Sequence, residues 1–158
     1  MVIGTDRKLA LMLSFPASVN SEEAAEEALD TFFDGEHYES LALEDPLSAE
    51  APDEREMRYI RTIVGHIGTH RAETDAYISR YARDWRTERI SKTAAAALRV
   101  AICEILYMDN IPSAVSINET VEMAKSFDSE ETVAFINGVL GSFVRGEGLE
   151  NKGKRTSS

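Results

Sequence analysis

Between Arg89 and Arg145 the chain carries three consecutive segments in which apolar residues recur at helical spacing. The breaks between these segments are only a few residues long, and one of them is Met108–Pro112. Apolar residues at positions i, i+3, i+4 and i+7 form one face of a helix, and that face must be buried against another element. No part of the chain alternates apolar and polar residues over the length of a strand. The sequence therefore predicts an all-α protein.

About seven helical segments can be placed along the chain, and the fifth is expected to lie at the centre. Ala97 and Ala101 give this fifth segment a thin flank, and Gly138 and Gly141 do the same for the seventh. Small side chains let helix axes approach toward the low end of the usual ~8–10 Å separation. The Asn137-Gly138 pair is read as helical, because the apolar spacing continues through it, with Asn137 as a polar contact between helices. The segments are residues 6–15 and 20–34, a third from 53 whose apolar residues run to 67, a fourth whose apolar residues run from 77 to 85, and then 91–106, 113–127 and 129–145.

The composition of the chain limits the class of protein. Its 158 residues predict one domain over residues 1–146, followed by a disordered polar tail over 147–158. A single cysteine, Cys103, excludes an intrachain disulfide. The sequence shows neither a membrane span nor a signal peptide, so we expect a cytoplasmic protein without a membrane partner.

The net charge of −11 is unevenly distributed along the chain. Residues 21–56 hold 14 of the 28 acidic residues and one basic residue, Arg55. The other residues hold 14 acidic and 16 basic side chains. Because phosphate contacts require Lys and Arg, the acidic segment is a poor nucleic-acid surface, whereas a basic patch can form elsewhere.

Several residue patterns bear on whether the chain holds a catalytic or metal site. His66, His70 and Glu73 share a helix face, and two histidines at this spacing can bind zinc. The glutamate that follows the first histidine in a metalloprotease motif is absent, because Ile67 stands there. We therefore favour a solvated helix end over a metal site. We interpret Cys103 as a small buried thiol rather than a nucleophile, because no base lies near it in the sequence. No phosphate loop or serine elbow occurs. We therefore expect no enzymatic activity, no cofactor and no metal.

Two polar patterns are candidate binding surfaces. Arginines recur every three residues at Arg80, Arg83, Arg86 and Arg89, either as a phosphate-contacting stripe or as an exposed face paired with nearby acids. Arg99 is interpreted instead as a structural cation that reaches a carboxylate or a helix end. In the sixth segment we expect a polar ridge of Asn118, Glu122 and Lys125 opposite an inward face, beside the Asp109–Pro112 loop. The inward face is predicted to hold Ala114, Ile117, Val121 and Ala124.

A specific set of motifs adds a family resemblance. The chain carries Ile111-Pro112-x-x-Val115-x-Ile117-Asn118-Glu119, then Ala124-Lys125-Ser126-Phe127, then Phe135-Ile136-Asn137-Gly138-Val139-Leu140. With these motifs the chain resembles the NusB family of transcription antitermination factors. The resemblance implies two all-helical subdomains, about residues 1–70 and 71–146. It also implies a non-enzymatic factor that binds boxA RNA of nascent ribosomal transcripts together with the ribosomal protein NusE, within the transcription elongation complex.

The resemblance and the two polar patterns together give the candidate residues of each surface. The family's arginine-rich opening is reduced here to Arg7, with Lys8 adding a charge at another position. The RNA-binding candidates are Arg7, Lys8, Arg80, Arg83 and Arg86. The partner-binding candidates are Asp109, Asn110, Ile111, Asn118, Glu119 and Glu122.

Two alternatives remain open. One is a helical interaction scaffold that self-associates, as a homodimer, and has lost RNA binding. The other is the detached RNA-targeting domain of an rRNA methyltransferase, whose cofactor-binding half does not occur in this sequence.

Overall fold

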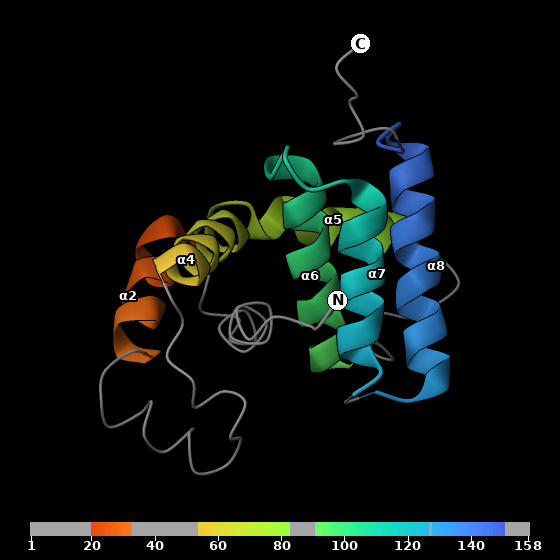
Figure 1. Ribbon diagram of the computed structural model, residues 1–158, viewed down its shortest axis with the longest axis horizontal. Helices are drawn as coiled ribbons and strands as arrows, with labels where there is room; N and C mark the ends of the chain where they lie inside the picture. Colours follow the sequence, from red (N-terminus) through yellow and green to blue (C-terminus); the bar gives the residue numbers. More distant parts are fainter. Residues whose placement is uncertain (1–19, 33–53, 83–90, 127, 151–158) are drawn as a thin grey trace. The chain divides into compact units, whose positions relative to one another are not determined.

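The structure is a computed structural model that describes residues 20–32, 54–82, 91–126 and 128–150. These residues form six helices and no strand (Figure 1), so the all-α prediction is confirmed. The predicted helix over residues 6–15 lies outside the described residues. The chain divides into two compact units, residues 1–71 and 72–158. The helices are α2 (Glu22–Phe32), α4 (Glu54–Thr69), α5 (Arg71–Tyr81), α6 (Lys92–Tyr107), α7 (Ser113–Ala124) and α8 (Glu130–Gly146).

In the first unit, α2 packs against α4. Ser21 caps α2, because its Oγ accepts a hydrogen bond from the Ala24 N–H at 3.1 Å. The N-cap thus lies one residue after Asn20, the predicted start, and the helix itself begins at Glu22. Gly68 is buried where the two helices meet. A Cβ on Gly68 would lie 2.4 Å from the Ser21 carbonyl oxygen and 2.9 Å from the Ala25 Cβ. The close approach of α2 and α4 therefore requires glycine at position 68.

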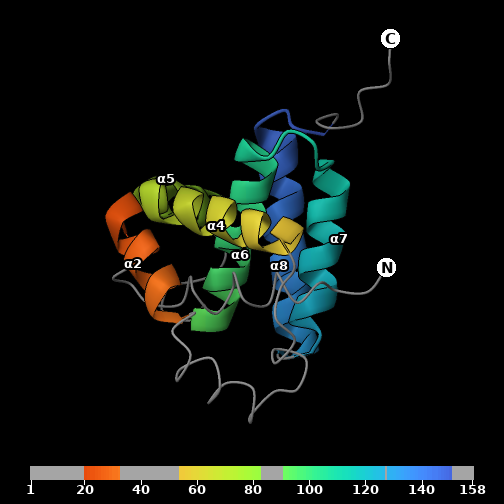
Figure 2. The ribbon, with the colours of Figure 1, turned by 60° about the vertical axis from the view of Figure 1, so that its left-hand side comes forward.

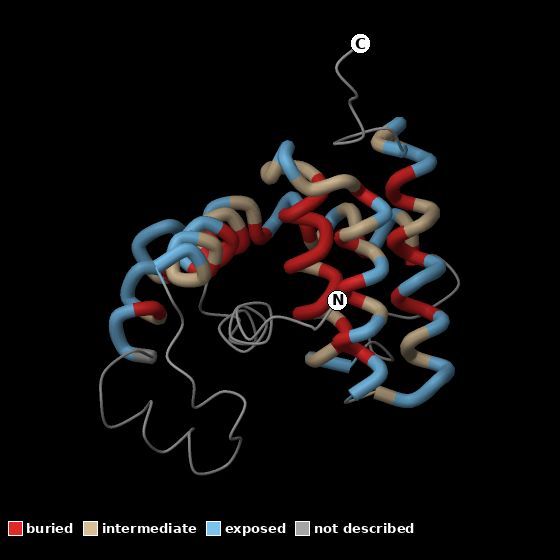
Figure 3. Tube along the Cα trace, viewed as in Figure 1, coloured by how far each residue is buried: buried red, intermediate tan, exposed pale blue. Residues whose placement is uncertain are grey.

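The second unit is built around α6, which packs against both α7 and α8, while α7 and α8 also pack against each other. Figures 1 and 2 show these three helices side by side. Ten of the sixteen residues of α6 are buried, including Ala97 and Ala101. Figure 3 shows the buried colour along much of this helix. A helix with one solvent face would bury about half of its residues, so α6 is the central helix of this unit, as predicted.

The α5 helix is attached to this unit by aromatic and ionic contacts. The rings of Tyr77 and Tyr81 both meet Phe143 of α8 edge-on, with centroid distances of 5.1 and 5.9 Å. Arg99 Nε of α6 donates to Asp75 Oδ1 of α5 at 2.8 Å. The interpretation of Arg99 as a structural cation that reaches a carboxylate is thereby confirmed.

The α8 helix runs without interruption through Asn137 and Gly138, as predicted. Its glycines do not play the expected role, however. A Cβ on Gly138 would meet nothing within 4 Å, and a Cβ on Gly141 would meet only the flexible side chain of Arg145. The prediction that these glycines allow close helix packing is wrong. Asn137 is also exposed rather than buried between helices.

The end of α8 is a Schellman motif. Gly148 adopts a positive φ of 69°, its N–H donates to the Arg145 carbonyl at 3.3 Å, and the Leu149 N–H donates to the Val144 carbonyl at 2.9 Å. The Leu149 carbonyl in turn accepts from Ser113 Oγ of α7 at 2.8 Å. The disordered tail was predicted to begin at Glu147, but residues 147–150 are ordered by these contacts; residues 151–158 lie outside the described part of the chain.

Candidate binding surfaces

The loop between α6 and α7 is fixed at both of its ends. The Met108 N–H donates to the Glu104 carbonyl at 3.0 Å, and the Ile111 N–H donates to the Met108 carbonyl at 3.1 Å. Pro112 has extended geometry and is the N-cap residue of α7. Asp109 and Asn110 are exposed, and Ile111 is half-buried. The loop therefore presents two polar side chains beside a partly accessible apolar one.

The exposed face of α7 continues this surface. Asn118, Glu122 and Lys125, which were predicted to form a polar ridge, are all exposed, and Ala114 is exposed with them. Lys125 Nζ lies 2.8 Å from Glu122 Oε1, and more than half of each side chain is exposed. An exposed pair of this kind contributes about 0–1 kcal/mol. Both charged groups can therefore exchange this contact for one with a binding partner.

Glu119 does not lie on this ridge. It is buried, with 7% of its surface exposed. The prediction that Glu119 lies on an exposed partner surface is therefore wrong. The predicted inward face also differs: Ala124 is buried, but Ala114 is exposed, and Ile117 and Val121 are half-buried. The buried face of α7 is Ser113, Ser116, Glu119, Thr120, Met123 and Ala124.

The physical reason lies in α6. Glu104 is fully buried, and its Oε1 accepts from Ser116 Oγ of α7 at 2.9 Å. Thr120 Oγ1 donates to the Ser116 carbonyl at 2.7 Å. A buried carboxylate needs hydrogen-bond donors, so α7 turns its hydroxyl-bearing side toward α6. A prediction based on apolar spacing alone places the wrong side of α7 inward.

A groove of about 510 Å³ runs between α7 and α8 beside the ridge. Val121, Val133 and Ala134 make it partly apolar, and polar side chains complete its lining. The α8 side of this surface is not evident from the sequence, because only the packing of the two helices brings Val133 and Ala134 next to Val121. The polar lining residues are Lys125, Asp128, Glu130 and Asn137.

The carboxyl group of Asp128, at the end of this groove, lacks a hydrogen-bond donor for one of its oxygens. Its Oδ2 is buried and forms no hydrogen bond, and the loss of solvent raises the pKa of its carboxyl above the usual value.

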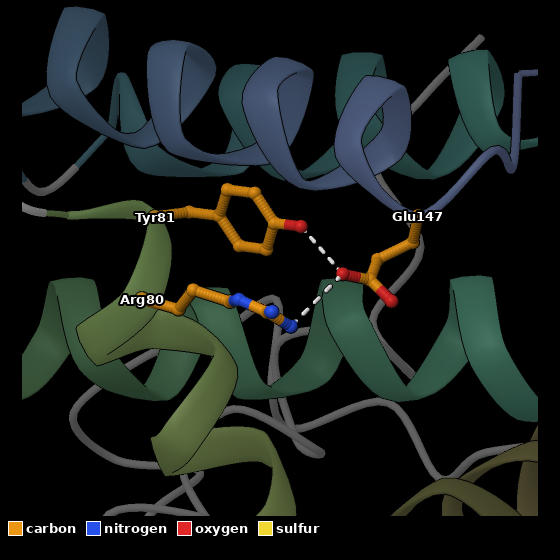
Figure 4. Close-up of polar contacts among 3 residues, drawn as sticks. All are labelled: Arg80, Tyr81 and Glu147. Atoms are coloured by element: carbon orange, nitrogen blue, oxygen red, sulfur yellow. Dashed lines mark hydrogen bonds and ion pairs between the residues drawn. The ribbon is translucent and has the colours of Figure 1, made fainter.

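One of the predicted RNA-binding residues can be placed. Arg80 NH1 lies 3.4 Å from Glu147 Oε2, and Tyr81 donates its hydroxyl to the same oxygen at 2.5 Å (Figure 4). The Arg80 side chain is nevertheless 65% exposed. Arg80 is thus held by a carboxylate on one side and open to solvent on the other. Arg7, Lys8, Arg83 and Arg86 lie outside the described residues.

Sequence reasoning missed a second set of arginines on α4. Arg55, Arg58 and Arg61 are all exposed and recur every three residues, the same spacing as Arg80 to Arg89. That spacing was visible in the sequence. Arg55 itself lies at the end of the acidic segment over residues 21–56, which masks the basic pattern that begins there.

The remaining candidates have ordinary structural positions. His66 and His70 stack with their ring centroids 5.9 Å apart, and partial burial together with the neighbouring His70 lowers the pKa of His66. Cys103 is fully buried, and the loss of solvent raises the pKa of its thiol. Within the described ranges, no group of three or more potential ligands could hold a metal ion. None of the described helices combines the length and apolarity needed to cross a membrane.

Comparison with known proteins places this arrangement in a family. The sequence profile of the NusB family matches residues 5–145. A transcription antitermination protein NusB of Thermoanaerobacter sp. (strain X514) is 44% identical over 111 residues, covering 70% of this chain and 78% of the relative. The NusB protein of Natranaerobius thermophilus is 39% identical over 111 residues, covering 68% and 79% respectively. That of Clostridium botulinum (strain Kyoto) is 33% identical over 138 residues, covering 87% and 96%. The chain belongs to the NusB family, a family of non-enzymatic factors.

Proposed function

We propose that this protein is a transcription antitermination factor that binds boxA-type RNA of nascent ribosomal transcripts together with the ribosomal protein NusE. The observation that carries this proposal is the family match over nearly the whole chain, with relatives that are named transcription antitermination proteins. A factor of this kind acts on the transcription elongation complex, so its place is the cytoplasm.

The NusE-binding surface is proposed to be the loop between α6 and α7 with the exposed face of α7. Asp109, Asn110, Asn118 and Glu122 supply acidic and amide groups around the partly exposed Ile111. Ribosomal proteins are generally basic, so carboxylates beside an apolar contact give a complementary surface. Glu119 is omitted from this set, because it is buried beneath the ridge.

The RNA-binding residues are proposed to be Arg7, Lys8, Arg80, Arg83 and Arg86. Arg80 supports this assignment, since most of its side chain is exposed although it is paired with Glu147. Few basic side chains are available for phosphate contacts in a chain with a net charge of −11. We therefore expect weak RNA binding by the protein alone and stronger binding in the presence of NusE.

The test is to measure the binding of a boxA RNA and of a scrambled RNA, each with and without NusE, over a range of salt concentrations. The expected result is preferential binding of boxA RNA, strengthened by NusE, with a log–log salt slope of about −0.7 per phosphate contact. Failure to bind boxA RNA in the presence of NusE would contradict the proposal. Self-association without RNA binding, detected by sedimentation in the same samples, would favour the homodimeric scaffold instead.

A further inference from the structure

The solvent-exposed face of α4 consists almost entirely of arginine and threonine. The opposite face is buried through Ile60, Ile63, Val64 and Ile67, which orients the helix firmly in the first unit. After the first residue of the helix, no acidic or apolar side chain of α4 is in the exposed class, and Glu56 and Met57 are half-buried. The exposed residues are Glu54, Arg55, Arg58, Arg61, Thr62 and Thr69.

Helix geometry places the three arginines together. A step of three residues turns the helix by about 300°, so Arg55, Arg58 and Arg61 lie within an arc of about 120°. They extend over about 9 Å along the axis. Gly65 follows on the same face, and a Cβ on it would meet nothing within 4 Å. At the end of the stripe no side chain therefore blocks access to the helix backbone at Gly65.

No ion pair with a described residue neutralises the charge of this stripe. In the part of the chain that the structure describes, neither Arg55, Arg58 nor Arg61 forms an ion pair. The adjacent helix α2 has five exposed carboxylates, but none of them pairs with these arginines. Like charges at three-residue spacing on a helix repel one another. An unpaired cationic stripe in a protein with a net charge of −11 is thus complementary to an anionic ligand.

We propose that Arg55, Arg58 and Arg61, the α4 stripe, bind the phosphate backbone of single-stranded RNA. This inference rests on the proposed RNA-binding function and adds a second surface, in the first unit, to the arginines named above. Arginine guanidinium and threonine hydroxyl groups are common donors to phosphate oxygens. A protein-binding surface would be expected to present an exposed apolar or aromatic anchor, and this face has none among its exposed residues.

Phosphate contacts carry no sequence information, so loss of the stripe should weaken the binding of every RNA sequence equally. Replacement of two stripe residues, Arg58→Gln with Arg61→Gln, should weaken the binding of boxA and scrambled RNA by the same factor, about tenfold near physiological salt. The salt slope should become shallower by about 1.4, because two contacts are lost at about 0.7 each. The measurement is an RNA titration of the full chain with NusE, at salt concentrations from about 50 to 200 mM.

A matched control separates the stripe from net charge. Lys92→Gln with Arg145→Gln removes two exposed positive charges from the second unit, and it changes the formal net charge by the same amount as the glutamine stripe variant. Because neither residue belongs to the stripe, this control should leave the salt slope unchanged. A second stripe variant, Arg58→Lys with Arg61→Lys, retains both charges and should preserve the slope. Thermal melts of all three variants confirm folding, which we expect to be retained because both stripe side chains are exposed.

The outcomes distinguish this inference from the proposed function. If the wild-type complex binds boxA RNA and the glutamine stripe variant binds it with equal affinity and slope, the inference is wrong while the proposed function stands. The inference is equally wrong if the glutamine variant loses affinity for NusE instead of RNA, since the stripe would then be a protein-binding surface. If the wild-type complex binds no RNA, the proposed function and the inference both fail.

Discussion

Gly146 lies directly against the ring of Tyr81. A Cβ on Gly146 would be 2.4 Å from Tyr81 Oη and 2.7 Å from its Cε1. The same hydroxyl donates to the Glu147 carboxylate, which also accepts from Arg80. One tyrosine at the end of α5 therefore determines both the residue type at the end of α8 and the position of the carboxylate beside Arg80.

This contact predicts opposite effects for two glycines of α8. Gly146→Ala should lower the free energy of unfolding by about 1–3 kcal/mol, because the new methyl group overlaps a packed ring. Gly138→Ala is the matched control: it has open space around the Cβ position, and it should raise the free energy of unfolding by about 0.5–1 kcal/mol. Urea unfolding of both variants measures the difference. Similar effects of the two substitutions would show that Tyr81 does not restrict position 146.

The packing of α2 on α4 predicts a similar contrast in the first unit. In Gly68→Ala the methyl group would meet the Ser21 carbonyl oxygen, which belongs to the backbone and cannot rotate away. We expect a loss of about 1–3 kcal/mol. Gly65→Ala, on the open face of the same helix, should be stabilising, since alanine is the better helix former. Equal melting temperatures for the two variants would contradict the close approach of α2 and α4.

The central position of α6 predicts that enlargement of its small residues is destabilising. Ala101 has no exposed surface, so Ala101→Leu should overpack the second unit and cost about 1–3 kcal/mol. Ala76→Leu is the control, because Ala76 is exposed on α5 and its enlargement should change stability by less than about 0.5 kcal/mol. A melting temperature of Ala101→Leu that matches the wild type would mean that α6 is not tightly enclosed.

The α7 surface predicts a defect in partner binding without a defect in folding. Asn118→Lys with Glu122→Lys makes the exposed ridge positively charged. Because ribosomal partners are generally basic, we expect slower association with NusE and lower affinity. Glu119→Lys serves as a contrast: that position is buried, so a lysine there should destabilise the protein itself. Calorimetry on folded protein, with circular dichroism as the folding check, measures both effects. Unchanged NusE affinity of the ridge variant would place the interface elsewhere.

Asp128 predicts a pH-dependent gain in stability. Its folded-state pKa is raised by burial, so the ionised carboxylate is disfavoured in the folded state and this residue costs stability at neutral pH. That cost disappears as the pH falls through the raised pKa to below the ordinary value of 3.8. Asp128→Asn should therefore have a higher melting temperature than the wild type at pH ~7, and the difference should shrink below pH ~4. A difference that is independent of pH would contradict the assigned cause.

The sequence by itself determined the helical class, the central helix and the family. Helical spacing is a local property, and the two short breaks between α6, α7 and α8 leave little freedom to the helices that they join. The Ser91 and Ser129 N-caps illustrate this: their hydroxyls accept from the N–H groups of Ala94 and Thr132, as the residue types favour. The burial of Cys103 and the ionic contact of Arg99 were likewise predicted from their positions among apolar neighbours.

Only the tertiary structure decided which faces and which small residues matter. The inward side of α7 depends on Glu104, a buried carboxylate on another helix whose need for donors overrides apolar spacing. The glycines that allow close contact are Gly68 and Gly146, opposite Ser21 and Tyr81, and not Gly138 or Gly141. A sequence states which side chains are small or charged. What lies opposite each of them is a contact between distant segments, which helical periodicity does not encode.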